Sequence, residues 1–205
     1  MGIETTCRVE TDAGAGEARV LLETEELVVR GALKTRIPFK SVEAAVVDGR
    51  KLIVSHGTSR TVLHLGPEAA RWADRILNPK SRLEKLGVKP GVVVSCQGIT
   101  DVALKDELTA AGATVSWGRI RKNSDLILLG VERDPEVSRI APAVASLRPS
   151  GAIWVVHPKG KEGVKDTAIF AAGREAGLVA TKVAKFSESH TAEKLVVPVA
   201  KRAGH

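Results

Sequence analysis

Eight basic or polar residues in the second half of the chain follow segments that have the pattern of strands. They form three groups: Arg119, Arg121 and Lys122; His157, Lys159 and Lys161; and Ser187 with His190. Cationic side chains combined with serine or histidine donors are the groups that an oxyanion site uses. In an open parallel sheet, ligands bind beyond the carboxyl ends of the strands. These residues therefore predict an anion-binding site for a phosphate-bearing ligand, with the alternative that they are solvated loop residues of a basic protein.

Motifs for catalysis, cofactors or metals do not occur in the sequence. It holds no P-loop, no Ser-His-Asp or Cys-His order, and no paired-carboxylate or metal-ligand spacing. Cys7 and Cys96 fall in strand-like segments of different parts of the chain and cannot form a metal set between them, so zinc is not expected. His157 and His190 would be the acid and base of an enzyme. We lean towards a protein without catalysis, and we assign no catalytic, cofactor-binding or metal-binding residue and no cofactor.

The candidate residues lie in a region that alternates between strand-like and helix-like patterns. Strands are predicted over 92–96, 114–117, 125–131, 152–157, 179–186 and 194–199, and helices over 81–86, 101–111, 135–147 and 164–176. The unbroken apolar run at 126–129 indicates a strand buried on both faces, which is typical of a parallel sheet between helices. We therefore predict a Rossmann-like, three-layer α/β domain with a mostly parallel sheet over residues 79–205.

Several segments of this domain resemble class I methyltransferases. Residues 86–94 (LGVKPGVVV) resemble the lead into the first strand of that family, 125–128 its fourth strand, 147–154 (LRPSGAIW) the approach to its fifth, and 176–178 the turn before a closing antiparallel hairpin. The residues that would hold S-adenosylmethionine differ. The loop after the first strand keeps one glycine, Gly98, where the family has Gly-x-Gly, and residues 116–119 (SWGR) replace the acidic residue that would hold the ribose. The third strand and its helix also look deleted, so we predict a degenerate methyltransferase-like fold.

The same region also resembles a bacterial family of short Rossmann-like proteins that is catalogued as a domain of unknown function. Residues 81–91, 124–127, 151–160 and 186–192 carry this resemblance, which covers roughly residues 78–198. It implies a fold and a bacterial origin, and it assigns no activity.

Residues 1–78 carry short apolar runs of strand length that are separated by turn sequences. Runs at 5–10, 18–22, 27–30, 33–37, 42–47, 52–55 and 61–65 predict strands, and Asp48-Gly49 between two runs indicates a tight hairpin. Residues 66–68 (GPE) then start a helix that places Trp72 and Ile76 on one face. The hairpin, residues 36–39 and the helix resemble the pleckstrin-homology-like barrels of bacterial proteins. This resemblance implies a small β-barrel with a C-terminal helix.

The net charge of +7 is concentrated in the second half, with +1 on residues 1–80 and +6 on residues 81–205. This charge favours an anionic partner, but the sequence lacks the interleaved aromatic residues that would support nucleic-acid binding. There is no apolar run near the ~18 residues that a membrane span requires, and residues 1–20 contain no apolar signal segment. We expect a soluble, cytoplasmic protein without a membrane span.

These observations do not identify an activity. The hypothesis that requires no catalytic or cofactor motif is a non-catalytic binding or scaffold protein with a protein partner. Small-anion or phosphate-ligand binding is one alternative, and nucleic-acid binding through the basic C-terminal domain is another that the sequence allows but does not favour.

Overall fold

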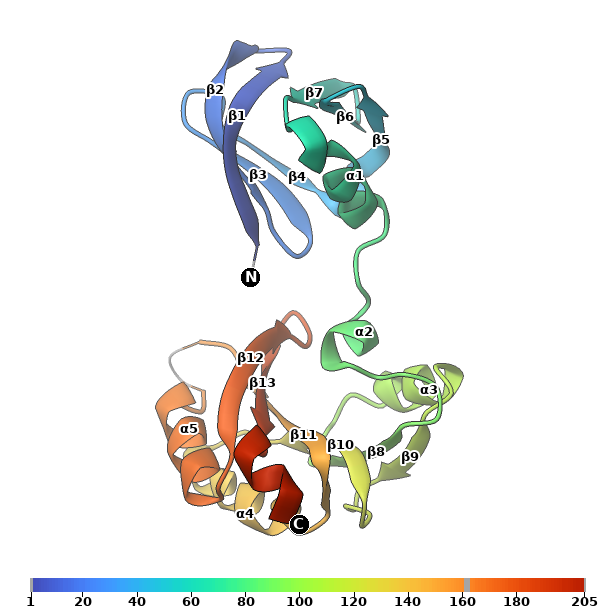
Figure 1. Cartoon of the computed structure of the whole chain (residues 1–205), viewed down its shortest axis with the longest axis vertical. Helices are drawn as coiled ribbons and strands as arrows, with labels where there is room; N and C mark the ends of the chain where they lie inside the picture. The colour runs from blue at the N-terminus through green and yellow to red at the C-terminus, as the bar shows by residue number, and fades with distance from the viewer. Residues whose placement is uncertain (1, 161–162, 205) are drawn as a thin grey trace. The chain divides into compact units, whose positions relative to one another are not determined.

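The computed structural model describes residues 2–160 and 163–204. The chain divides into two compact units, Met1–Lys80 and Ser81–His205 (Figure 1), two residues beyond the boundary expected from the sequence. Each unit is built on its own sheet. Across the residues that the structure describes, none of the helices combines the length and the apolar character that crossing a membrane requires.

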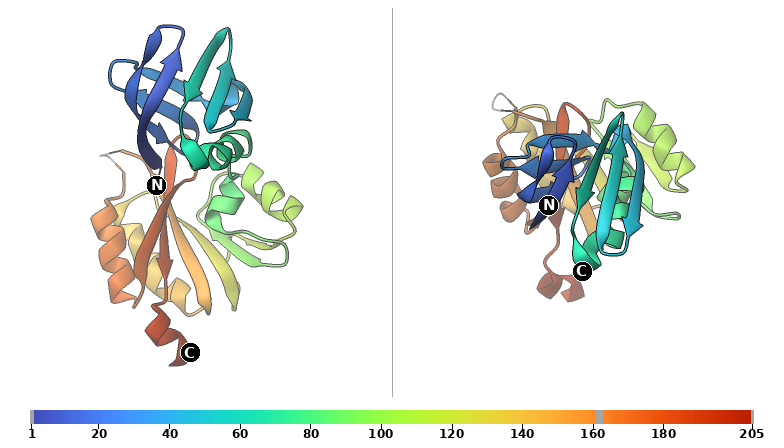
Figure 2. Two further views of the ribbon diagram at one scale, coloured as in Figure 1. Left: turned by 45° about the horizontal axis from the view of Figure 1, so that its top comes forward. Right: turned by 90° about the horizontal axis from the view of Figure 1, so that it is seen from above.

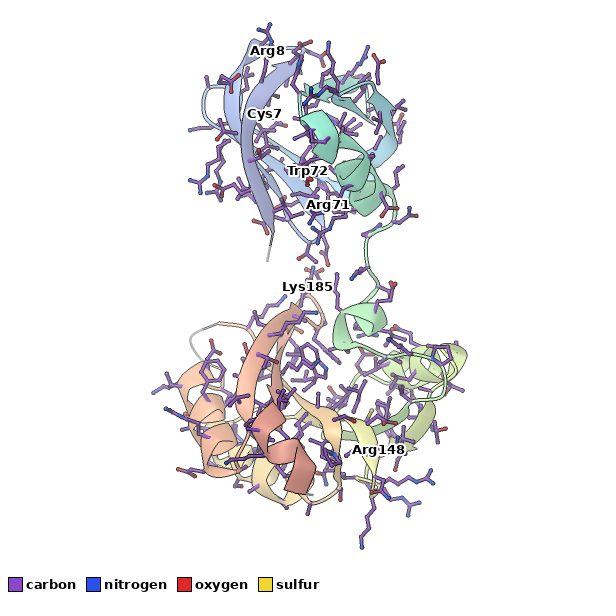
Figure 3. The ribbon with its side chains drawn as sticks, in the orientation of Figure 1. Cys7, Arg8, Arg71, Trp72, Arg148 and Lys185 are labelled. Carbon is purple, nitrogen blue, oxygen red and sulfur yellow. The ribbon has the colours of Figure 1, made fainter. Side chains whose placement is uncertain are left out.

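Seven antiparallel strands form the sheet of the first unit, in the order β4-β3-β2-β1-β7-β6-β5. They are β1 (Ile3–Thr11), β2 (Gly14–Leu22), β3 (Glu26–Arg30), β4 (Thr35–Pro38), β5 (Val42–Asp48), β6 (Lys51–His56) and β7 (Ser59–Leu63). Successive side chains of a strand point to opposite faces, so Cys7 is buried whereas its neighbour Arg8 is exposed (Figure 3). The predicted hairpin is confirmed: Asp48 pairs with Lys51, and Gly49 takes a φ of 57° in the two-residue turn between them.

The helix α1 (Ala69–Leu77) follows this barrel-like sheet and completes its core. Ala69, Trp72, Ala73 and Ile76 recur at three- and four-residue spacing, which places them on one helix face, and all four are buried. Trp72 is 1 % exposed and belongs to the same apolar cluster as Leu52 of β6 (Figure 3). A large aromatic side chain buried in this way dominates the energetics of a small core.

Six strands form the sheet of the second unit, in the order β12-β13-β11-β10-β8-β9. They are β8 (Val93–Gln97), β9 (Thr114–Trp117), β10 (Ser124–Gly130), β11 (Leu147–Pro158), β12 (Val179–Lys185) and β13 (His190–Val196). The strands β9, β8, β10 and β11 pair in parallel, whereas β13 pairs antiparallel with both β11 and β12. The sheet is therefore mixed, with a parallel part and a closing antiparallel hairpin.

Helices cover both faces of this sheet (Figure 2). They are α2 (Arg82–Leu86), α3 (Ala103–Ala110), α4 (Ile140–Val144) and α5 (Asp166–Glu175). Leu126 and Leu128 of β10 pack into one apolar cluster with α2 and α3, and Ile127 and Leu129 pack into another with α4 and α5. The apolar run at 126–129 is thus buried on both faces, as its composition predicts.

Three predicted elements of the second unit are wrong in their extent. The strand expected over 152–157 is β11, which begins five residues earlier. The helix expected over 135–147 is a 3-10 helix over Asp134–Arg139 followed by the short α4, and β11 already begins at Leu147. Pro142 has no N–H to donate to the carbonyl of Ser138, so a continuous α-helix cannot form there. The strand expected over 194–199 is β13, which begins four residues earlier, because its pairing with β11 extends to His190.

Candidate functional site at the carboxyl edge of the mixed sheet

A cavity of about 260 Å³ lies where β8 and β10 end, and we refer to it as the edge cavity. Its apolar lining consists of Ile99, Val156 and Phe186. Its polar side chains are those of Thr100, Asp101, Glu132, Ser187, Ser189 and His190. The parallel strands β8 and β10 end at this edge, so the cavity occupies the position where open α/β sheets bind ligands. Its volume lies below the ~300–1,000 Å³ of sites for drug-sized molecules, which suits a smaller ligand.

Two glycines bring the loop after β8 into direct contact with the end of β10. A Cβ atom on Gly130 would lie 2.0 Å from the carbonyl oxygen of Gly98, and Gly98 has a φ of 71°. Neither position therefore accepts a side chain without displacement of the backbone. The guanidinium of Arg139 donates to the Gly130 carbonyl at 3.2 Å. Gly98, the glycine that the sequence retains after β8, thus allows a close backbone contact with Gly130 beside the edge cavity.

Three lining side chains of the edge cavity form a hydrogen-bonded series. The Ser189 hydroxyl lies 2.8 Å from Nδ1 of His190, and Nε2 of the same ring lies 3.3 Å from Oε1 of Glu132. A hydroxyl, an imidazole and a carboxylate in this order are the groups that general acid–base and nucleophilic catalysis use. The sequence analysis named His190 but missed Glu132, which is 58 residues away and carries no spacing signal.

Arg82 of α2 fixes another wall of the edge cavity. Its guanidinium binds the carboxylates of Asp101 and Glu107, with Nη2 at 2.6 Å from Oε1 of Glu107, and lies 5.2 Å from the centre of the Phe186 ring. Burial raises the pKa of Asp101, but the hydrogen bond and the charge of Arg82 outweigh it and hold that pKa below its usual value. The described residues that line the cavity therefore offer carboxylates and hydroxyls and include no lysine or arginine.

The predicted anion-binding residues of the β11 and β12–β13 groups lie together. Ser187 and His190 line the edge cavity. The ammonium of Lys159 donates to the carbonyls of Ser187 at 2.7 Å and Glu188 at 3.0 Å, and its backbone N–H donates to the carbonyl of Ser189. Lys159 therefore ties the end of β11 to the turn between β12 and β13. Lys161 lies outside the described residues.

Arg119, Arg121 and Lys122 lie in residues 118–123, the segment that joins β9 to β10. Because β8 stands between these two strands, the segment crosses one face of β8. Ser95 Oγ accepts a hydrogen bond from the Arg121 N–H at 2.9 Å, Ser124 Oγ donates to the Arg121 carbonyl at 2.6 Å, and the two hydroxyls lie 2.8 Å apart. The three basic side chains are exposed and do not line the edge cavity. Anion binding by the predicted residues stays a prediction.

His157 lies in β11, as the predicted strand over 152–157 implies, but it faces away from the edge cavity. It is 2 % exposed, and its Nε2 lies 3.7 Å from Oδ1 of Asp166. Burial lowers the pKa of His157, against the charge of Asp166, which raises it. Glu193 of β13 lies nearby with 6 % exposure, and its pKa is raised by burial and by the charge of Asp166. The sequence analysis missed both carboxylates.

Comparisons with known proteins find similarity at the level of three-dimensional structure. No protein-family model matches the sequence, and no curated protein matches it. An O-methyltransferase from Thermotoga maritima is 12 % identical with a TM-score of 0.46, over 94 % of this chain and 93 % of that chain. Magnesium protoporphyrin IX methyltransferase from Synechocystis is 12 % identical with a TM-score of 0.45, over 57 % and 74 %.

A further structural match covers a smaller share of the chain. A structure of the PH and C1 domains of the Vav1 exchange factor is 12 % identical with a TM-score of 0.30, over 36 % of this chain and 24 % of that chain. The chain thus spans about a quarter of that protein's length.

Proposed function

We propose that the second unit binds a small polar molecule in the edge cavity, and that this molecule donates hydrogen bonds through hydroxyl or amine groups. The observation that carries the proposal is the lining. The carboxylates of Asp101 and Glu132 and the hydroxyls beside them are acceptors, whereas Ile99, Val156 and Phe186 supply apolar surface. A pocket with an apolar floor and a few convergent polar groups is the usual form of a small-molecule site.

The charge of the lining separates this proposal from the phosphate hypothesis. An anion would approach Glu132, whose side chain is half exposed, and the described lining offers it no cationic side chain. Like charges at short distance repel, so a neutral or cationic ligand is favoured over an anionic one.

NMR titration of the full chain tests the proposal. Glycerol, ribose and putrescine serve as hydroxyl and amine probes, and inorganic phosphate and acetate serve as anions. We expect the amide signals of Gly98, Gly130 and His190 to shift with one of the first group. Thr100→Phe, at an exposed lining position, should remove that shift, whereas Thr109→Phe, at an exposed position on α3, should not. A shift with phosphate alone, or equal shifts in both variants, would contradict the proposal.

A second candidate function is ester hydrolysis, in which the Ser189 hydroxyl attacks the carbonyl carbon of the bound ester. His190 takes the hydroxyl proton and returns it to the departing alcohol, and water then releases the acyl group from Ser189. This function is favoured by the series Ser189, His190 and Glu132, in which a base contacts both a hydroxyl and an orienting carboxylate. Hydrolysis of p-nitrophenyl acetate provides an assay. Turnover that falls to the level of buffer in both Ser189→Ala and His190→Gln supports this function, and turnover that is unchanged in both variants removes it.

We also propose a specific fold type for each of the two units. The parallel order β9-β8-β10-β11 and the antiparallel β12–β13 hairpin support a Rossmann-like domain of the methyltransferase type, in which a six-residue crossing stands where a further strand and helix would be. The barrel-like sheet followed by α1 supports a pleckstrin-homology-like first unit. Membership of the bacterial family of unknown function, a cytoplasmic location, a scaffold role and nucleic-acid binding stay predictions.

A further inference from the structure

Two neighbouring strands and one helix bring His157, Asp166 and Glu193 together on the face of the sheet that α5 covers. Glu193 of β13 pairs with Val155 of β11, and Thr191 pairs with His157, so the two functional side chains lie on the same face and two residues apart in register. Asp166 is the first residue of α5. This group of three is called the His157 cluster below.

The spacing within the His157 cluster is close to that of ligands on one ion. The imidazole Nε2 of His157 lies 3.7 Å from Oδ1 of Asp166, and one ligand atom from each of the three residues lies within 4.8 Å of the other two. Two ligand atoms bound at ~2.1 Å to a tetrahedral zinc ion stand about 3.4 Å apart. Rotamer adjustments of about 1 Å therefore suffice to place all three atoms on a common ion.

Two side chains of the cluster lack a hydrogen-bond partner at the atoms that would bind an ion. Nε2 of His157 is buried and accepts no hydrogen bond from any described residue. The carboxylate of Glu193, a residue that is 6 % exposed, makes no hydrogen bond or ion pair with another residue of 2–160 and 163–204. A buried polar group without a partner costs free energy, and a buried charge without one costs far more. An ion at the centre of the cluster would supply the missing partner to both side chains.

The orientation of the imidazole is also that of a metal ligand. Nδ1 of His157 lies 3.2 Å from the carbonyl oxygen of Pro158, which can only accept, so Nδ1 carries the proton. The neutral ring then presents the lone pair of Nε2 to Asp166 and Glu193. Histidines that bind metals usually donate their other ring N–H to a carbonyl or carboxylate in this manner.

The apolar core covers the cluster on one side, and solvent reaches it on the side of Asp166. Val155 and Ile169 belong to the apolar core on this side of the sheet, whereas the Asp166 side chain is 61 % exposed. Its place in the first turn of α5 also favours its negative charge, because the helix N-terminus carries a partial positive charge. An ion can therefore reach the cluster from the side of Asp166.

We infer that the His157 cluster binds a divalent first-row transition ion, of which zinc is the representative, through one imidazole and two carboxylates, with water at the remaining position. Three protein ligands and one open position are the arrangement of zinc sites that admit a further ligand. Imidazole favours zinc, iron and cobalt over calcium and magnesium, which take oxygen ligands. This site is separate from the edge cavity, and neither proposal depends on the other.

Titration of the full chain with zinc after removal of metals by EDTA tests the inference. Calorimetry should give one site per chain, and the melting temperature should rise with the zinc concentration. Cobalt should produce the visible absorption of a tetrahedral ion. Glu193→Gln and His157→Gln should weaken zinc binding by more than about tenfold. His190→Gln, which alters the histidine–carboxylate pair at the edge cavity, is the matched control and should leave zinc binding unchanged.

Asp166→Asn keeps the test decisive if the two buried substitutions impair folding. Its side chain is largely exposed, so the variant should fold as the parent does while its zinc affinity falls. The ¹⁵N shift of Nε2 in His157 gives a direct readout, and it should move on zinc addition in the parent chain only. No zinc binding, or equal zinc binding in the parent, Asp166→Asn and His190→Gln, would overturn the inference.

Discussion

The interiors of the two units differ in what they bury. Within residues 2–80 the buried polar side chain is that of Thr61, and its hydroxyl lies 3.2 Å from Nε2 of His56. The described part of the second unit buries Ser95, Ser124, His157 and Glu193. A buried polar group is costly unless it has a partner, so the contacts of these four side chains decide what each contributes.

Those four side chains also differ from one another. Ser95 and Ser124 bond each other and the backbone of residue 121, so they hold the crossing segment in place. His157 and Glu193 have no comparable partners among the described residues. The first pair therefore explains the fold, whereas the second pair indicates a ligand. The predictions below test this contrast, beginning with the largest effect.

Removal of the central apolar side chain of the first unit should have the largest effect on stability. Trp72→Ala should lower its unfolding free energy by about 3–5 kcal/mol, because the change leaves a cavity among buried residues. Trp72→Phe should cost much less, since Nε1 of Trp72 has no hydrogen-bond partner among described residues. Hydrogen exchange of amides in residues 2–80 during urea unfolding measures both changes. Equal losses in the two variants would contradict an apolar role.

The matched change in the second unit sharpens the same contrast. Nε1 of Trp154 donates to the Leu86 carbonyl at 2.9 Å, so Trp154→Phe leaves that carbonyl without its donor. We expect Trp154→Phe to cost about 1–3 kcal/mol more than Trp72→Phe. Urea unfolding of the two variants, followed by amide exchange in each unit, measures the difference, and equal costs would remove the contrast between the two tryptophans.

Removal of the serine hydroxyl under the crossing segment should cost about 1–3 kcal/mol. Ser95→Ala deprives the Arg121 N–H of its acceptor and Ser124 of its neighbour. Urea unfolding and the exchange rate of the Arg121 amide report the change, and Ser150→Ala at an exposed position is the control. A Ser95→Ala chain as stable as the control would mean that the buried serines do not hold the segment.

Replacement of the unpaired carboxylate should have the opposite sign. Glu193→Leu should raise the unfolding free energy of the EDTA-treated protein by about 1 kcal/mol, because it removes a buried group that lacks a partner. Glu175→Leu, at an exposed position on α5, should leave stability nearly unchanged. Destabilisation by Glu193→Leu would show that Glu193 is satisfied in the folded protein, and it would weaken the contrast between the two units.

The smallest expected effect concerns acid stability at the edge cavity. The pKa of Asp101 is lower in the folded chain than its usual value of 3.8, so its contribution to stability is complete above that value and is lost as the pH falls through the lower, folded value. Arg82→Ala should flatten the decline in stability below about pH 4. Urea unfolding across that range measures the slope, and an unchanged slope would mean that Arg82 does not set the charge of Asp101.

Local sequence pattern by itself determined much of this protein. The period-2 runs of the first unit, the Asp48-Gly49 turn and the 126–129 run predict elements that the structure contains, because strand alternation and turn geometry depend on neighbours in the chain. The extents of elements follow less directly from pattern, as Pro142 shows, since its missing donor prevents one continuous α-helix over 135–147 although the apolar pattern continues. The sequence also identifies the charged residues that follow the strands, but it does not identify the residues that lie next to them in space.

Tertiary structure alone decided which side chains meet. His157, Asp166 and Glu193 come from β11, α5 and β13, and antiparallel pairing together with helix packing sets their approach. Glu132 contacts His190 although 58 residues separate them in the sequence. Arg119 and Lys122 do not line the edge cavity, because they lie in the six-residue segment that crosses β8. A sequence records residue types and their local periods, but the register of distant strands follows from the burial of whole faces, and the candidate sites depend on that register.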